Sequence, residues 1–416
     1  MTEDEIYRAS TQYRLWNFTP EQLEERRNST NALAIKQTRA AFKRKRDLAA
    51  QLSSADASAT TSEAEGNGSG NANANGTNGA PKAEVEEVEC LTPDEEKKLV
   101  AYMCFNLLEL VMEQKRFGDL PIHVAGTAVQ FLKRFYLSHS PIDYHPRNLL
   151  PTAIFLATKT ENVYTSLEHF SEKLMAVPGF KKGGSTDAIL APEFILTQGL
   201  RFCFDVRHPF RALRGFYFQE LAILKDIAQG GQPPPGFTTR PAKQVQEELL
   251  RGKPLQKFLE SVEYYPHVKD TLQRAALLSD AYFLYTPAQI HFAAWYMHNP
   301  FILEYYIDLK LAVSPNPLVK DRLMEVIRNC AALLDESQKK GQEAPEEIAR
   351  LNKKLTKCQN PDKKDLISLN KATKRDGAAD GEISESQAKK RKLQREKNEK
   401  ESENLFGPTL VKPEDA

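Results

Sequence analysis

The chain has 416 residues, 41% of them hydrophobic, so it is long enough for two or three domains and can bury at least one core. Its 57 Lys and Arg residues against 56 Asp and Glu residues give a net charge of +1, which excludes an overall field that attracts nucleic acid or an anionic membrane. No apolar run approaches the roughly 18–20 residues of a membrane span, and the N-terminus does not resemble a signal peptide. We therefore expect a soluble, intracellular protein with no membrane partner.

The cysteines and histidines do not form a recognisable metal or catalytic pattern. The five cysteines are scattered without a C-x-x-C pair, which favours small apolar core residues in a reducing compartment over disulfides or zinc; they are Cys90, Cys104, Cys203, Cys330 and Cys358. Structural roles are likewise favoured for His145, His208, His267, His291 and His298, because no pair has metal-site spacing backed by a carboxylate or cysteine. No metal or cofactor is expected, and nothing assembles a nucleophile with a base, so an enzyme is not expected.

The first 90 residues divide into a polar helical arm, 1–52, and a linker, 53–90. A helix start is predicted at Thr19, with Pro20 as its first residue and Gln22 completing a capping box. Ahead of it, an apolar cluster suited to attach the arm to a globular body comprises Tyr13, Leu15, Trp16 and Phe18. The linker is rich in Ser, Ala, Gly and Asn and is predicted to be disordered, since it offers too little apolar surface to offset the entropy of ordering.

The segment 91–205 reads as a bundle of about five helices. It begins with a second Thr-Pro capping box at Thr92, and its first helix carries an apolar stripe at Leu99, Met103, Leu107 and Val111. Further helices are predicted from about Pro121 to Phe135, at 145–161, at 167–175 and at 191–204. The helix at 145–161 (HPRNLLPTAIFLATKTE) is apolar nearly all round until Lys159, Thr160 and Glu161, so it should be the buried central helix with charge at its end.

The segment 206–340 repeats this outline. Helices are predicted at 209–227 and 267–284, followed by a third Thr-Pro capping box at Thr286 that opens the helix IHFAAWYMHN. In both segments an aromatic-rich helix end is followed by a turn, a proline and a helix with small central residues, which allow close helix approach. The predicted fold is therefore all-α, with two tandem helical repeats and no credible strands.

Two further segments complete the chain. A C-terminal helix is predicted within 341–360, with Ile348, Leu351 and Leu355 on the face that docks on the body. The charged tail, 361–416, is predicted to be disordered. The Gly-rich loop PGFKKGGST does not fit a phosphate-binding loop, because no strand precedes it and its lysines come before the glycines.

Two basic runs are candidate interaction segments. Lys43–Arg46 lacks interleaved aromatics, so a solvated helix face or an import signal is favoured over nucleic-acid binding. A nuclear-import signal is the better interpretation of the run in the polar tail, although a plain charged tail also fits it; this run is Lys389, Lys390, Arg391 and Lys392. Nuclear localisation is the resulting expectation.

Several segments resemble the cyclin family. The segments 127–162 (TAVQFLKRFYLSHSPIDYHPRNLLPTAIFLATKTEN) and 192–211 (PEFILTQGLRFCFDVRHPFR) resemble the cyclin box. LSDAYFLYTPAQI at 278–290, with the flanks YRLWNFTPEQLEE and EEIARLNKKLTKC, resembles the cyclin H group in particular. The resemblance covers most of 91–340 and implies two cyclin boxes of about five helices each, with extra N- and C-terminal helices.

The resemblance also implies a kinase-binding surface. In cyclins a lysine at the end of the third box helix and a glutamate on the fifth contact the kinase, and they correspond here to Lys159 and Glu193. On one predicted helix, Glu193 would share a stripe with Thr197, Leu200 and Phe204. The full predicted set is Lys159, Glu193, Leu156, Thr160, Phe194, Thr197, Leu200 and Phe204. Taken singly, a lysine and a glutamate on helices more often mark a solvated face or an intramolecular ion pair.

Three departures from the family pattern stand out. Asn162 occupies a position where many cyclins have an acid, and the first box helix lacks the substrate-docking pattern MRAIL. The linker is also longer than the family requires.

The implied function is that of a non-catalytic subunit that binds and activates a cyclin-dependent kinase. By resemblance, this CDK-activating kinase phosphorylates other cyclin-dependent kinases and the RNA polymerase II C-terminal domain within TFIIH, with a RING-type assembly factor as third subunit. The alternative is a kinase-free helical scaffold of the transcription machinery, since related two-repeat folds bind DNA. The mixed charge of 91–340 favours the kinase activator, so direct nucleic-acid binding is not expected.

Overall fold

The computed structural model describes residues 3–59, 88–112, 120–181, 183–232, 264–312, 317–340 and 343–368, with isolated positions between 234 and 257. The chain divides into two compact units, Met1–Leu366 and Ile367–Ala416, and nearly all described residues belong to the first. Every regular element in these ranges is a helix, which confirms the all-α prediction. None of the helices found there is both long and apolar enough to span a membrane.

The N-terminal arm consists of α1 (Glu3–Ala9), α2 (Thr11–Trp16) and the long α3 (Pro20–Ala59). The predicted capping box at its start is confirmed: the Thr19 N–H donates to Gln22 Oε1 at 3.0 Å, and the Gln22 N–H donates to Thr19 Oγ1 at 3.3 Å. Helix α3 continues through 53–59, residues that the sequence analysis places in the linker. Its basic run, Lys43–Arg46, is exposed. Residues 60–87 of the linker and the run Lys389–Lys392 lie outside the described residues.

The predicted aromatic attachment of the arm is confirmed. Trp16 and Leu23 are buried with Leu137 and Phe283, which come from the first and second repeats. The Phe18 N–H also donates to the Phe283 carbonyl at 2.8 Å. Because α3 is too polar to be stabilised by an apolar face of its own, contacts with the body such as these help to order its first half.

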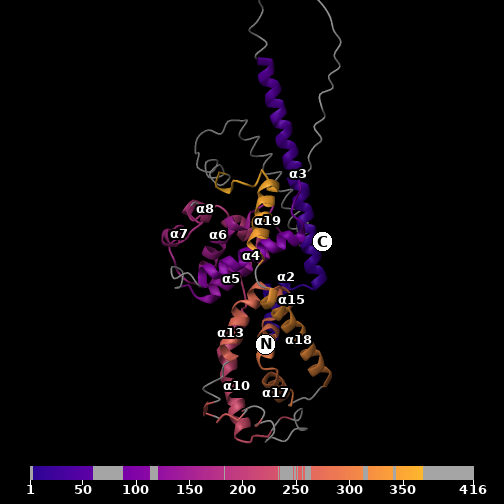
Figure 1. Cartoon of the computed structure of the whole chain (residues 1–416), viewed down its shortest axis with the longest axis vertical. Helices are drawn as coiled ribbons and strands as arrows, with labels where there is room; N and C mark the ends of the chain where they lie inside the picture. Colours follow the sequence, from indigo (N-terminus) through magenta and orange to yellow (C-terminus); the bar gives the residue numbers. More distant parts are fainter. Residues whose placement is uncertain are drawn as a thin grey trace, which may run out of the picture. The chain divides into compact units, whose positions relative to one another are not determined.

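The first repeat contains the helices that carry the candidate site (Figure 1). They are α4 (Pro93–Met112), α5 (Ile122–Phe135), α6 (Pro146–Thr160), α7 (Leu167–Met175), α8 (Thr186–Leu190) and α9 (Glu193–Gly199). Helix α6 contacts all five of the others, and its side chains from Leu149 to Thr158 are buried. It is the central helix that its apolar sequence predicts.

The second repeat follows the same plan. Its elements are η1 (Pro209–Ala212), α10 (Leu213–Ala228), α13 (Tyr264–Gln273), α14 (Ala275–Leu278), α15 (Ala281–Leu284), α16 (Pro287–His298), α17 (Pro300–Leu311) and α18 (Pro317–Lys340). Thr286 and Gln289 form the predicted capping box at the start of α16. The buried Ala293 and Ala294 lie in its middle, where close approach of neighbouring helices needs small residues.

The single helix predicted over 267–284 is wrong. The helix breaks at Arg274, whose backbone leaves the helical region at φ −121° and ψ −73°, and again at Ser279 and Asp280. The second break, at Ser279 and Asp280, has a tertiary cause: the buried Lys133 ammonium of α5 donates to the Leu277, Leu278 and Ser279 carbonyls. Carbonyls that accept from Lys133 turn away from the helical hydrogen-bond ladder.

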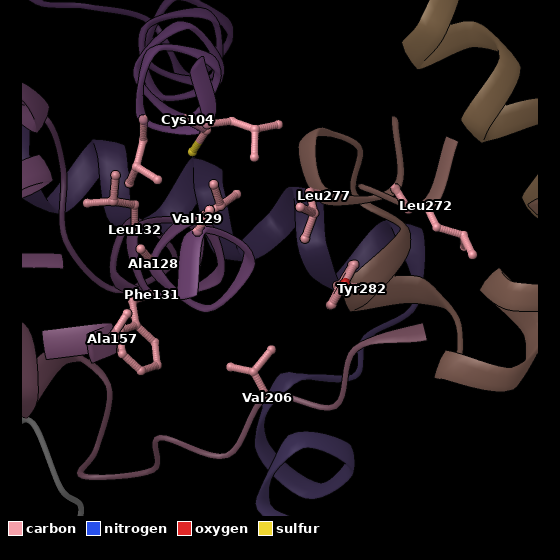
Figure 2. Packing of buried hydrophobic residues seen from close by; sticks show 14 of the residues in the cluster. Cys104, Ala128, Val129, Phe131, Leu132, Ala157, Val206, Leu272, Leu277 and Tyr282 are labelled. Carbon is pink, nitrogen blue, oxygen red and sulfur yellow. The ribbon is translucent and has the colours of Figure 1, made fainter. Parts of the chain in front are cut away.

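One cluster of buried side chains runs through both repeats. In Figure 2, Ala128 and Phe131 of α5 lie near Ala157 of α6, and the second-repeat residues Leu277 and Tyr282 are buried in the same cluster. The C-terminal helix α19 (Pro345–Cys358) packs on α4 through its predicted apolar face of Ile348, Leu351 and Leu355. The repeats therefore share a continuous core, with the arm and α19 packed against it.

Candidate functional site

The candidate site lies where the end of α6 meets the start of α9. Lys159 is in the last turn of α6, and Glu193 is the first residue of α9, 34 positions later. Their side chains form an ion pair at the surface, with the lysine 45% exposed and the glutamate 25% exposed. The Lys159 ammonium also lies 4.4 Å from the centroid of the Phe155 ring, a cation–π distance. Lys159 and Glu193 therefore pair with each other in the chain on its own.

The end of α6 is fixed by its backbone. The Glu161 N–H donates to the Ala157 carbonyl at 2.9 Å, and the Val163 N–H reaches back to the Thr158 carbonyl at 2.9 Å. This closure requires Asn162 to take a left-handed conformation, φ 57°, which asparagine tolerates better than most residues. Asn162 therefore has a backbone role at the position where many cyclins have an acid.

Helix α9 is shorter than predicted. The sequence predicts a helix from 191 to 204, but the structure has α8 ending at Leu190, a turn, and α9 ending at Gly199. A Cβ at Gly199 would overlap the buried ring of Phe135, so this glycine lets α9 pack tightly on α5. The prediction that Glu193 and Phe204 share a stripe on a single helix is therefore wrong. Phe204 lies beyond the helix and is half-buried, with its ring centroid 6.0 Å from that of Phe131.

Besides the half-buried Phe204, the other seven predicted kinase-binding residues divide by exposure. At the surface, wholly or in part, are Lys159, Thr160, Glu193, Phe194 and Thr197, with Phe194 62% exposed. Leu156 and Leu200 are core residues, 6% and 0% exposed, so they support the site from beneath. Thr160 uses its hydroxyl locally, donating to the Ala157 carbonyl at 3.2 Å.

Two exposed aromatic residues, which follow the two helices of the site, were missed by the sequence analysis. Phe202 is 58% exposed, and Tyr164, in the turn after α6, is 94% exposed. Phe202 and its neighbour Arg201 both have positive φ, 55° and 53°, which is uncommon for bulky residues. The Phe202 N–H donates to the Thr197 carbonyl at 3.1 Å, so the end of α9 holds the ring outward. The sequence did carry a signal for Tyr164, namely an aromatic residue within the short polar segment NVYTS.

Three of the histidines singled out in the sequence have structural hydrogen-bond partners. His145 caps α6 by accepting from the Arg147 N–H at 3.1 Å, and His298 lies 2.9 Å from the Thr271 hydroxyl. Trp295 Nε1–H donates to His291 Nε2 at 3.0 Å, so the other ring nitrogen of His291 donates to the Pro209 carbonyl at 3.1 Å. No group of His, Cys, Asp or Glu suited to a metal ion occurs within the ranges that the structure describes.

Comparisons with known proteins identify the family. Residues 208–335 match the family model of the cyclin C-terminal domain. Cyclin CCL1 from Saccharomyces cerevisiae is 26% identical over 317 residues, covering 74% of this chain and 62% of that protein. Cyclin-H from Xenopus laevis is 28% identical over 281 residues, covering 67% of this chain and 75% of that protein. The chain thus spans less than two thirds of the length of cyclin CCL1.

A solved structure agrees with these relatives. A chain of the CAK complex from Chaetomium thermophilum, bound to ATP-gamma-S, superimposes with a TM-score of 0.64 at 27% sequence identity. The match covers 92% of this chain and 99% of that chain. Together with the two-repeat helical fold, these matches show that the chain is a cyclin H-like member of the cyclin family.

Proposed function

We propose that this chain is the regulatory subunit of a CDK-activating kinase, which binds the catalytic subunit of a cyclin-dependent kinase and activates it. The observation that carries the proposal is the surface ion pair of Lys159 and Glu193, next in sequence to the exposed Phe194, in a chain of the cyclin H type. The chain itself contributes no catalytic group in this scheme.

The chemistry of the site suits a protein partner. A base and an acid at the junction of two helices offer charge-assisted hydrogen bonds to a partner's backbone or side chains. The exposed ring of Phe194, next to Glu193 in the sequence, supplies apolar area of the kind that dominates binding energy at interfaces. Binding there would hold the regulatory helix of the kinase inward and complete the kinase's own Lys–Glu ion pair and magnesium site.

The wider assembly follows from the same proposal. A RING-type assembly factor is the third subunit, and the complex works in the nucleus with the TFIIH core. Its substrates are other cyclin-dependent kinases and the C-terminal domain of RNA polymerase II. The relationship to a chain of a CAK complex supports this assignment.

The second candidate function is a kinase-free helical scaffold of the transcription machinery. A scaffold of this fold that binds DNA needs a basic face on its repeats. In the two repeats, basic side chains are instead paired with acidic ones, as in Arg274 with Glu109 and Lys320 with Asp308. This distribution favours the kinase activator.

The proposal is tested with a double variant, Lys159→Ala with Glu193→Ala. Kinase binding and phosphorylation of a polymerase-tail peptide are measured with the kinase subunit of the Chaetomium thermophilum CAK complex. We expect the affinity to fall about tenfold or more, because charge-assisted contacts at the interface are lost. The single variant Lys159→Ala leaves Glu193 unpaired in the interface, a cost of roughly 2–5 kcal/mol.

The matched control is Asp335→Ala with Lys339→Ala. It removes an exposed i,i+4 ion pair from α18, a helix that contacts neither α6 nor α9 closely. The control should bind and activate like the parent chain. If the Lys159/Glu193 variant does so as well, the proposed interface is wrong.

A further inference from the structure

A chain of hydrogen bonds links the second repeat to the last turn of α6. The Tyr282 hydroxyl of α15 lies 3.0 Å from His208 Nδ1, and His208 Nε2 lies 2.9 Å from the Thr127 hydroxyl of α5. Thr127 in turn lies 2.6 Å from Oε1 of Glu161, the C-cap residue of α6. The other oxygen of Glu161 accepts from Arg211 at 3.1 Å. Glu161 is thus held from both sides, two residues after Lys159.

The direction of each hydrogen bond follows from the chemistry of the groups. A carboxylate paired with arginine only accepts, so the Thr127 hydroxyl donates to Glu161 and must accept from His208 Nε2–H. The remaining nitrogen, Nδ1, then accepts from the Tyr282 hydroxyl. This arrangement needs a neutral imidazole, and burial lowers the pKa of His208 well below its ordinary value, with the positive charge of Arg211 acting in the same direction.

Packing fixes the histidine in this orientation. A Cβ at Gly126 would lie 2.8 Å from His208 Cε1, so only glycine lets α5 approach the ring this closely. The ring of Phe210 is stacked on His208, with centroids 4.6 Å apart. The side chains of His208 and Tyr282 are 3% exposed each and Thr127 is fully buried. These hydrogen bonds therefore form a rigid connection between the repeats from which water is excluded.

We infer that Thr127, His208 and Tyr282 are positioning residues through which the second repeat sets the geometry of the kinase-binding end of α6. The inference rests on the proposed function. The Glu161 N–H is also a backbone cap of α6, bonded to the Ala157 carbonyl, so a shift of the Glu161 side chain is transmitted to the turn that carries Lys159. None of the three residues needs to touch the kinase for this effect.

The test is Thr127→Val, which keeps the shape of the side chain and removes the hydroxyl that joins Glu161 to His208. Affinity for the kinase subunit of the Chaetomium thermophilum CAK complex is measured in parallel with thermal unfolding of the full chain. We expect a roughly five- to tenfold loss of affinity, about the value of one buried hydrogen bond. Thr127→Ser, which retains the hydroxyl, should restore most of it.

Two further variants separate positioning from stability. Thr271→Val removes another hydrogen bond between a buried threonine and a histidine, to His298, but in the second repeat alone. It should lower the unfolding temperature without changing kinase affinity. Tyr282→Phe removes only the hydroxyl that bonds His208, at the second-repeat end of the hydrogen-bond series. Its affinity for the kinase should fall severalfold. This variant keeps the inference falsifiable if Thr127→Val does not fold.

A double-mutant cycle supplies the decisive readout. If positioning acts through Lys159, Thr127→Val should have little further effect on affinity in a Lys159→Ala background. The inference is overturned if the loss is undiminished there, or if Thr127→Val and Tyr282→Phe bind like Thr271→Val. If the parent chain does not bind the kinase at all, the proposed function fails and the inference fails with it. If the parent chain binds and only the variants behave otherwise than expected, the inference alone fails.

Discussion

At the scale of single residues, several polar side chains are buried with their hydrogen bonds satisfied by distant partners. Glu96 of α4 is 8% exposed and accepts a hydrogen bond from the Ser140 hydroxyl. Its place in the helix sequence PDEEKK suggests a solvated acid, like its neighbours. Burial instead raises the pKa of Glu96 to about 7, with the nearby Asp143 charge acting in the same direction.

This raised pKa predicts a pH-dependent contribution to stability. The folded chain keeps Glu96 protonated up to about pH 7, whereas the unfolded chain releases that proton near 4.5. The contribution of Glu96 is therefore fully present below about pH 4.5 and is lost as the pH rises through 7. We expect the free energy of unfolding of the parent chain, relative to Glu96→Gln, to fall by about 3 kcal/mol between pH 4 and pH 8.

Denaturant unfolding of the two chains across this pH range checks the prediction. Glu347→Gln provides a comparison of opposite sign, because hydrogen bonds from Arg350 lower the pKa of Glu347. Relative to that variant, the parent chain should gain stability as the pH rises. A constant difference between the parent chain and Glu96→Gln would show that Glu96 titrates as it does in the unfolded chain.

At the scale of elements, the position of the short helix α9 decides where Glu193 lies. Helix α9 packs against both α5 and α6, and Gly199 is the point of closest approach to Phe135. The Phe135 ring is itself stacked on His139, with centroids 4.3 Å apart, so it has no room to move aside. The placement of the acid at the candidate site thus depends on a glycine at the other end of its helix.

We expect Gly199→Ala to destabilise the chain by about 1–3 kcal/mol, because the added methyl group overpacks a filled core. The matched control is Gly215→Ala on α10, where an added Cβ meets nothing within 4 Å. There the exchange should stabilise the chain by roughly 0.5–1 kcal/mol, the usual gain of alanine over glycine within a helix. Unfolding curves that move in the same direction for both variants would contradict this account of α9 packing.

At the scale of the whole folded unit, Asp280 joins the arm and both repeats. Its carboxylate accepts two hydrogen bonds from Arg27 of α3, at 2.8 and 2.9 Å. It also lies 3.4 Å from the ammonium of Lys97 and 3.9 Å from that of Lys133. Burial alone would raise the pKa of Asp280, but the Arg27 hydrogen bonds and these charges hold it well below the usual range.

Removing this carboxylate charge should loosen several elements at once. In Asp280→Asn the buried Lys133 and the half-buried Arg27 lose their counter-charge, for which we expect a cost of about 3–5 kcal/mol. Asp335→Asn is the control, since it breaks only the exposed pair with Lys339 and should change stability by no more than about 0.5 kcal/mol. Amide hydrogen exchange in α3 should increase in Asp280→Asn alone; unchanged protection of α3 would show that the arm is held by its aromatic cluster without this pair.

The sequence by itself determined the elements whose signals are local. Three Thr-Pro capping boxes fix helix starts because their hydrogen bonds join residues three apart, and the apolar run of α6 predicts a buried helix wherever it packs. The two-repeat plan follows from these signals. The choice of Lys159 and Glu193 as a site rests on the cyclin resemblance. The opposite charges of the two side chains support it.

Only the tertiary structure decided the features that join distant residues. Lys133 interrupts the helix predicted over 267–284 at Ser279, through carbonyls 144 to 146 positions away, and no local pattern carries that contact. Leu200 became a core residue and Phe202 an exposed one where α9 ends at Gly199 against α5. Periodicity and capping act over a few residues, whereas burial and exposure depend on which elements meet in space.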